Sequence, residues 1–232
     1  MQSEQYMQWK RVSNCDYEAL QKNGTWELLQ LYGIDYLEVY SPVVRLETLR
    51  ELLTFAAVWD YEVHQMDVTM TFLNGKIGVE VFMEQLEDVR VIGKEDWVCH
   101  LLKSLYGLKQ ASRVWFDLLK SFLQKQGFTM LKCEPCVAVK VIDGQLVFIP
   151  LYVDDLILFA PNMKIINQMK TMFGERFEMK DLGRFHYILG WGVTRNSDES
   201  IVFINQHKYR KSVLERFGIV SAMVARHQAH QN

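Results

Sequence analysis

The chain has few of the residues that mark disordered, fibrous or disulfide-stapled proteins. Its 232 residues include only 4 Pro, 13 Gly and 4 Cys. This scarcity, with 49% hydrophobic residues, excludes a collagen-like, low-complexity or disordered chain. Four cysteines in a chain of this length give no disulfide framework and predict a reducing, intracellular setting. Cys133 and Cys136 have the spacing of half a zinc site, but structural zinc needs four ligands.

Long hydrophobic segments are also missing. The longest strongly apolar run, Leu146–Val153, ends at two aspartates. It is far shorter than the roughly 20 apolar residues of a membrane-spanning helix. The N-terminal sequence MQSEQYMQWKRV is polar and has no apolar stretch typical of a signal peptide. We therefore expect a soluble protein with no membrane partner, in the cytoplasm or the nucleus, and no targeting segment is seen.

The sequence has no large excess of charge of either sign. It carries 26 Lys+Arg against 28 Asp+Glu, a formal net charge of −2, so bulk charge does not predict nucleic-acid binding. Two segments are nevertheless locally basic. Their cations are Lys103, Lys109, Arg113, Lys120 and Lys125 in one, and Lys208, Arg210, Lys211, Arg216 and Arg226 in the other. Each segment is either a solvated helix face or a set of phosphate contacts whose binding depends on salt.

The spacing of apolar residues predicts helices mixed with antiparallel strands. Helices are expected over residues 43–59, 110–126, 163–177 and 206–217. Strands are expected over residues 62–68, 79–83, 97–102, 137–142, 145–149, 151–153, 156–159, 185–193 and 201–204. Asp143-Gly144 is a strong hairpin turn, Asp154-Asp155 is expected to form the next turn, and Pro150 predicts a sheet edge or a bulge. The order predicts an α+β domain with an antiparallel sheet flanked by helices.

The most informative feature is the pair of acids in Tyr152-Val153-Asp154-Asp155. Two adjacent acids between apolar strands either face solvent at a turn or hold a cation, because neighbouring carboxylates raise each other's pKa unless they are neutralised. A third acid, Asp67, lies near the end of the strand expected over residues 62–68. If the two strands are neighbours, Asp67 and Asp154 can bracket two Mg²⁺ ions about 3.5–4 Å apart. An ordinary acidic turn remains the alternative.

Several longer motifs carry a resemblance to a known family. They are Gly33–Tyr36 with Ser41–Val44, Gln65–Val68 with Phe72–Gly75, Lys103–Ala111, Tyr152–Asp155, and Met179–Gly183 with Leu189-Gly190. In this order, the chain resembles the reverse transcriptase of copia-type LTR retrotransposons, the RNA-dependent DNA polymerase domain of a Pol polyprotein. The resemblance implies a right-hand polymerase fold. Residues 1–31 would be an N-terminal remnant of the fingers, 32–193 the palm with residual fingers, and 194–232 the end of the primer-grip hairpin, the start of the thumb and the tail.

The resemblance also implies a role for each matching residue. The catalytic carboxylates would be Asp67, Asp154 and Asp155, and the metal ligands Asp67, Asp154 and the carbonyl of Val68. The nucleotide-binding residues would be Met70, Thr71, Phe72, Tyr106, Gly107 and Lys109, with Phe72 as the gate against a ribose 2′-hydroxyl, and the primer grip would be Leu189 and Gly190. The implied cofactors are two Mg²⁺ ions, for which Mn²⁺ can substitute. One would activate the primer 3′-hydroxyl and the other would hold the triphosphate. The implied partners are an RNA or DNA template with its primer, deoxynucleoside triphosphates and the rest of a retrotransposon polyprotein.

The sequence departs from the family pattern near Leu31-Tyr32. Asn23–Leu28 matches the opening of the family's domain, whereas Tyr32–Tyr36 matches a point well downstream. The basic fingers strands that hold the triphosphate are therefore expected to be missing, which weakens nucleotide binding. Thr71 also stands where the family usually has Ala.

Three functions follow from these observations. The first is RNA-directed DNA polymerisation by two-metal nucleotidyl transfer to a primer. The second is a catalytically inactive retrotransposon remnant that at most binds nucleic acid. The third is a metal-dependent phosphohydrolase that uses the same acids. Because a fingers segment is missing, the sequence leaves open whether this copy is an active enzyme.

Overall fold

The computed structural model describes residues 20, 22–29, 41–196 and 199–218. The junction at Leu31-Tyr32, most of the N-terminal segment and the tail beyond residue 218 lie outside the described residues. The described helices are α2 (Leu46–Val58), α3 (Ala111–Lys125), α4 (Met163–Gly174) and α5 (His207–Arg216), with short 3₁₀ turns η1 (Thr71–Asn74) and η2 (Glu87–Val89). None of the helices in these ranges is long and apolar enough to span a membrane.

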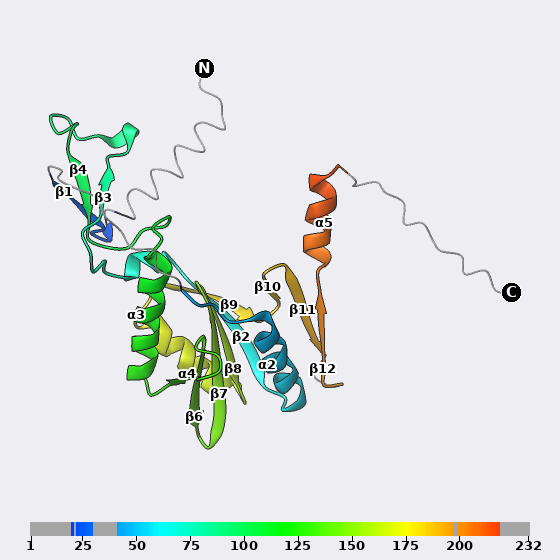
Figure 1. Ribbon diagram of the computed structural model, residues 1–232. Coiled ribbons are helices and arrows are strands. Elements are labelled where there is room, and N and C mark those ends of the chain that lie inside the picture. Colours follow the sequence, from blue (N-terminus) through cyan, green and yellow to red (C-terminus); the bar gives the residue numbers. More distant parts are fainter. Residues whose placement is uncertain (1–19, 21, 30–40, 197–198, 219–232) are drawn as a thin grey trace.

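The centre of the molecule is a six-stranded antiparallel sheet in the order β5-β6-β7-β8-β2-β9 (Figure 1). Its strands are β5 (Thr129–Met130), β6 (Val137–Ile142), β7 (Gln145–Tyr152), β8 (Asp155–Ala160), β2 (Glu62–Val68) and β9 (Met179–Arg184). The ladder between β2 and β8 runs from Glu62 opposite Ala160 to Asp67 opposite Asp155. The strand ends that carry the acids are therefore neighbours in the sheet.

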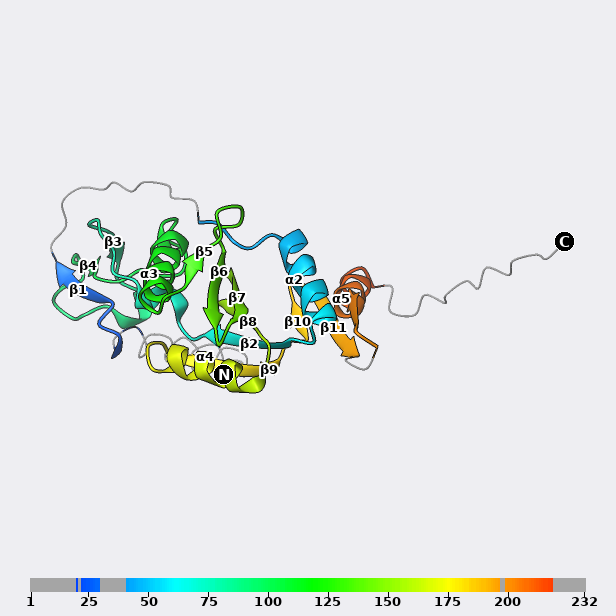
Figure 2. The same cartoon turned by 90° about the horizontal axis from the view of Figure 1, so that it is seen from below.

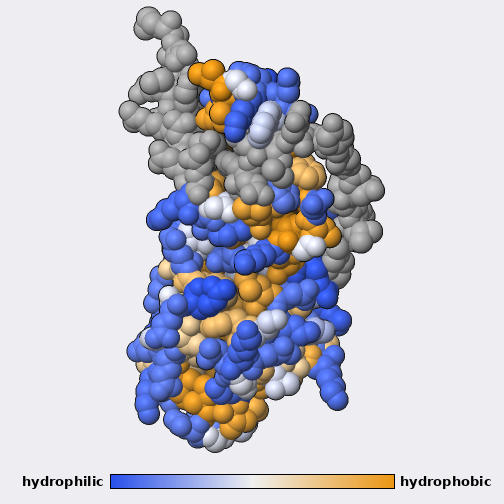
Figure 3. Space-filling model, turned by 90° about the vertical axis from the view of Figure 1, so that its left-hand side faces the viewer, coloured by the Kyte–Doolittle hydropathy of each residue, from blue (hydrophilic) through white to orange (hydrophobic). Residues whose placement is uncertain are grey.

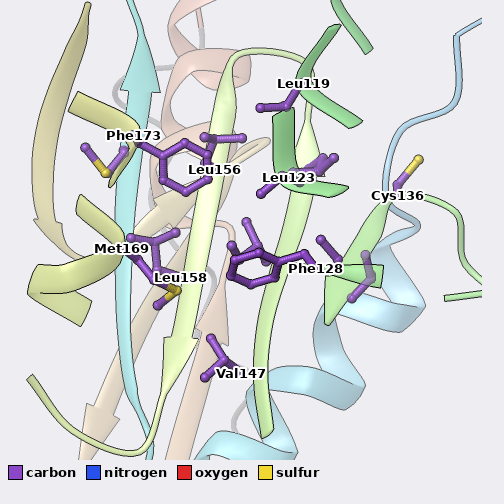
Figure 4. Close-up of a cluster of buried hydrophobic side chains, with 14 of the residues drawn as sticks. Leu119, Leu123, Phe128, Cys136, Val147, Leu156, Leu158, Met169 and Phe173 are labelled. Carbon is purple, nitrogen blue, oxygen red and sulfur yellow. The ribbon is translucent and has the colours of Figure 1, made fainter. Parts of the chain in front are cut away.

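Strand β8 is buried on both faces, because its alternating side chains enter two different hydrophobic clusters. Leu156 and Leu158 pack in a cluster with α3 and α4, whereas Ile157 and Phe159 pack in a second cluster with α2 and with residues that follow β9. Figure 4 shows part of the first cluster, with the labelled side chains Leu119, Leu123, Phe128, Cys136, Val147, Leu156, Leu158, Met169 and Phe173. The sheet is thus covered by helices on both faces.

Two small antiparallel sheets lie at opposite ends of the central sheet (Figure 2). One has the order β1-β4-β3, from β1 (Trp26–Leu29), β4 (Val98–Leu101) and β3 (Phe82–Glu84). The other has the order β10-β11-β12, from β10 (Tyr187–Ile188), β11 (Trp191–Asn196) and β12 (Ile201–Asn205). Helix α5 follows β12 and has no buried residue.

The mixed α/β class, the antiparallel sheet and all four predicted helices are confirmed, and residues 62–68 match β2 at both ends. The prediction of separate strands around Pro150 is wrong, because β7 runs through it, and the expected sheet edge is also wrong, because β7 lies between β6 and β8. The β7–β8 ladder passes from the pair Phe148–Phe159 directly to the pair Leu151–Leu156. The ladder therefore has a break beside the proline, which has no N–H to donate.

The prediction of one strand over residues 185–193 is also wrong. The structure has a turn at Leu189-Gly190 that separates β10 from β11. Both residues have positive φ, 50° and 84°, as in the type I′ turns that close tight hairpins. Leucine is unusual in this conformation, so residue type did not reveal the turn.

A buried histidine ties α4 to β2 and β9. His64 on β2 is 6% exposed, and its Nδ1 accepts a hydrogen bond from Nζ of Lys170 on α4 at 2.9 Å. The same ammonium donates to both carboxylate oxygens of Asp181 on β9 at 2.8 Å. Burial, and next the positive charge of Lys170, lower the pKa of His64. The ring is therefore neutral when this contact is made.

The protein is expected to lose stability as the pH falls below the pKa of an unfolded histidine, about 6.5. The pKa of His64 is lower in the folded state, so the unfolded state binds more protons below that pH. The free energy of unfolding of His64→Gln should therefore fall less than that of the wild type between about pH 7.5 and about pH 5.5. Urea denaturation at both pH values measures this. His186→Gln, at an exposed histidine, is the matched control, and its free energy of unfolding should depend on pH as in the wild type. The wild-type pH dependence in His64→Gln would contradict the prediction.

Candidate active site

Three acids, one on β2, one on β8 and one in the β7–β8 turn, meet at one end of the central sheet. Asp67 is the penultimate residue of β2 and lies opposite Asp155, the first residue of β8. The N–H of Val68 donates to the carbonyl oxygen of Asp154 at 3.0 Å, which ties the end of β2 to the β7–β8 turn. The expectation that the two strands are neighbours is therefore confirmed.

The turn between β7 and β8 consists of Val153 and Asp154, and not of Asp154-Asp155 as predicted. Tyr152 pairs with Asp155, so the second acid already belongs to the strand. Val153 has a φ of 54°, an uncommon conformation for a β-branched residue. Its carbonyl accepts a 2.6 Å hydrogen bond from the indole N–H of Trp115, a residue that is 2% exposed. A buried side chain of α3 thus holds the strained turn.

The carboxylates repel one another. Burial, and next the charge of Asp154, raise the pKa of Asp67, and Lys180 offsets part of this effect. Burial also raises the pKa of Asp155, and a hydrogen bond from Gln65 opposes it. A cation placed between Asp67 and Asp154 would relieve this repulsion. Within the described ranges, no group of three or more His, Cys, Asp or Glu side chains is arranged as a ready metal site.

The backbone after Asp67 turns sharply into η1. Met70 has a φ of 49° and precedes η1, and the hydroxyl of Thr71, which is fully buried, donates to the carbonyl oxygen of Val68 at 2.8 Å. Thr71 therefore fixes the carbonyl that the family resemblance assigns to a metal. At Gly75, which follows η1, an added Cβ would collide with Cγ1 of Val114 on α3. The turn is thus packed directly on that helix.

Two aromatic side chains contact each other at this turn. The rings of Phe72 and Tyr106 have centroids 4.5 Å apart. The phenol of Tyr106 is hydrogen-bonded to the side chain and the backbone of Thr71, while burial foremost and the charges of Asp154 and Asp67 raise its pKa. Met70, Thr71, Phe72 and Tyr106 are thus brought together beside the acids.

The remaining candidate residues lie further along the chain. Gly107, with a φ of 93°, follows Tyr106, and Lys109 is exposed just before α3. Leu189 and Gly190 form the β10–β11 turn, in a different sheet from the acids.

Two residues that hold the site were not assigned to it from the sequence. Gln65 is two residues before Asp67 on β2, so strand alternation places both side chains on the same face, a signal that was available. Trp115 is buried, and its bond to the turn depends on how α3 packs, which no local pattern predicts.

Comparisons with known proteins agree with one another. A family model described as "Reverse transcriptase (RNA-dependent DNA polymerase)" matches residues 22–227. The chain is 35% identical to the "Retrovirus-related Pol polyprotein from transposon TNT 1-94" of Nicotiana tabacum, over 89% of this chain and 18% of that polyprotein. It is 29% identical to the "Retrovirus-related Pol polyprotein from transposon RE2" of Arabidopsis thaliana, over 82% of this chain and 13% of that polyprotein. The chain thus spans less than a fifth of either plant polyprotein.

The tobacco alignment bears on the expected gap. It extends over 246 positions, more than the 232 residues of this chain. The tobacco protein therefore has residues within the aligned region that have no counterpart here, as a missing segment requires.

Removing the charge of Asp154 is expected to lower the pKa of Asp67, because a neighbouring negative charge that opposes ionisation is lost. The carboxyl carbon of Asp67 can be followed by NMR during a pH titration of Asp154→Asn. Asp60→Asn, at an exposed acid that pairs with Arg195, is the control and should leave the pKa of Asp67 unchanged. An unshifted Asp67 in Asp154→Asn would show that the two carboxylates do not interact.

Proposed function

Since this chain belongs to the reverse transcriptase (RNA-dependent DNA polymerase) family, among the copia-type retrotransposons, we propose that it extends a primer by nucleotidyl transfer at the acids on β2, on β8 and in the β7–β8 turn. The observation that carries the proposal is the β2–β8 ladder, which brings Asp67 beside Asp154 in the turn and Asp155 at the start of β8. The six-stranded sheet would then be the palm. The β1-β4-β3 sheet would be what remains of the fingers, and the β10–β12 sheet with α5 would be the primer grip and the start of the thumb.

The donor groups suit divalent cations. Asp67, Asp154 and the carbonyl of Val68 would hold Mg²⁺, or Mn²⁺ in its place, because Mg²⁺ favours one or two carboxylates completed by substrate phosphates and water. The charge of Asp154 raises the pKa of Asp67, so the two carboxylates are close enough to repel each other and to gain from sharing a cation. When bound, two such ions supply activation of the primer hydroxyl and neutralisation of the leaving pyrophosphate.

The protein's own part is positioning. The N–H of Val68 holds the backbone of Asp154, the indole of Trp115 holds Val153, and the hydroxyl of Thr71 holds the carbonyl of Val68. All three contacts fix the backbone next to the acids, and none of them uses a carboxylate oxygen. Such preorganisation is the main contribution expected of a phosphoryl-transfer site.

Substrates would be deoxynucleoside triphosphates and a primer on an RNA or DNA template. Of the basic side chains on α3 and α5, Arg113 pairs with Asp117 at 2.8 Å and Lys211 with Glu215 at 3.8 Å, so these two are partly neutralised. On the face seen in Figure 3, hydrophilic side chains are interspersed with hydrophobic ones. The family resemblance predicts that the basic fingers strands are missing, so we expect a high KM for the triphosphate.

Extension of a DNA primer on an RNA template with Mg²⁺ tests the proposal directly. Asp154→Asn is expected to lower the rate by at least about a hundredfold, since it removes a charge from the reacting centre. Asp143→Asn is the matched control, because Asp143 lies in the neighbouring β6–β7 turn with a positive φ that Asn also tolerates. It should keep the wild-type rate.

The outcomes separate the three functions. Folded wild-type protein that binds the primer–template duplex without extending it would be an inactive remnant. Turnover of a nucleotide without a primer would identify a phosphohydrolase instead.

Phe72 is expected to select the sugar. Replacing it with Val should raise incorporation of ribonucleotides relative to deoxynucleotides by about tenfold or more, because the smaller side chain leaves room for a 2′-hydroxyl. Parallel extensions with the two nucleotide classes measure the ratio. Phe203→Val, at a residue on β12 that is 64% exposed, is the control. Unchanged selectivity in Phe72→Val would remove Phe72 from the sugar site.

A further inference from the structure

The two adjacent aspartates are held in different ways. Oδ1 of Asp155 accepts a hydrogen bond of 2.6 Å from Nε2 of Gln65, and Gln65 is only 4% exposed. Asp154 lies in the turn, and in the described part of the chain no hydrogen bond to its carboxylate is found. One carboxylate is therefore fixed to β2 and its neighbour is free to turn.

Sheet register explains why Gln65 reaches Asp155. Asp67 lies directly opposite Asp155, and Gln65 is opposite Ile157, so Gln65 is the diagonal neighbour of Asp155 on the same face. A long side chain spans this diagonal. On its other side Gln65 faces Gly183 of β9, which has no side chain to compete for the space.

We propose that Gln65 is a positioning residue, which holds one oxygen of Asp155 on β2 and so leaves Asp154 to serve as the ligand from this pair. The proposal rests on the proposed function, since it concerns the same metal-binding carboxylates. The hydrogen bond from the buried Gln65 amide to one carboxylate oxygen fixes the rotamer of Asp155. Without this hydrogen bond, Asp155 competes with Asp154 for the same ion. Partners that orient carboxylates in this way commonly affect metal affinity or activity by about 10- to 100-fold.

Gln65→Met tests this role, because Met has a similar length and is apolar but cannot donate a hydrogen bond. Mn²⁺ binding to the chain alone, followed by electron paramagnetic resonance, should weaken by about tenfold. In primer extension, kcat should fall about 10- to 100-fold while the KM of the nucleotide stays within about twofold. Gln85→Met is the matched control: Gln85 is also buried, at 7% exposure, but its amide bonds to Lys94 and Trp97 beyond β3. It should lose stability and keep the wild-type affinity for Mn²⁺.

A double-mutant cycle separates positioning from a general structural effect. Asp155→Asn should still bind Mn²⁺, and adding Gln65→Met to it should cause little further loss, because Gln65 acts through Asp155. Loss of Mn²⁺ binding in Asp155→Asn would identify Asp155 as the ligand and overturn the proposal. Additive losses, or unchanged or tighter binding in Gln65→Met, would also overturn it.

The metal measurement stands apart from polymerase activity. A wild-type chain that binds Mn²⁺ but extends no primer would overturn the proposed function, while the cycle would still decide the role of Gln65. A wild-type chain that binds no Mn²⁺ would overturn both.

Discussion

The pairing of β2 with β8 is the constraint on which the rest of the structure depends. It places Asp67 opposite Asp155 and brings three carboxylates into one corner of the sheet. Burial foremost, and in addition the charges of the neighbouring acids, raise the pKa of Asp67 and of Asp155. Such repulsion opposes the pairing, so the strands must be held together by other means. The two hydrophobic clusters on either face of β8 provide that support, since the burial of apolar side chains such as Leu158 and Phe159 favours the paired state.

The backbone next to the acids is also held in place by its surroundings. Backbone groups next to the acids are fixed by buried donors from three places: Trp115 on α3, Val68 on β2 and Thr71 in η1. Val153 keeps a positive φ that a β-branched residue rarely adopts, and conformations of this kind persist only where the surroundings over-determine them. Rigidity at this corner is thus a property of the packing around it.

Much of this could be predicted from the sequence, because it depends on local patterns. The alternation over residues 62–68 was sufficient to predict β2 with the bounds that it has, and the apolar spacing of residues 110–126 predicted α3. The errors occurred where tertiary contacts override residue type. Pro150 lies in an inner strand because the ladder to β8 skips it. Leu189 adopts a positive-φ turn conformation, which a glycine or asparagine at that position would have indicated. The bonds from Gln65 and Trp115 cross between elements, so no local signal specified their partners.

The acids and the candidate primer grip differ in how deeply the surrounding residues are buried. The acids lie at the end of β8, whose residues 156–160 are all buried, whereas α5 buries no residue and the β10–β11 turn carries an exposed Leu189. Segments with few buried contacts open locally at a low free-energy cost, while core strands open only with global unfolding. Backbone amides of α5 should therefore exchange with solvent long before those of β8. The β10–β11 turn and α5, which would guide a primer, can thus open and close as a separate cooperative unit. The corner of the sheet that carries the carboxylates stays folded meanwhile.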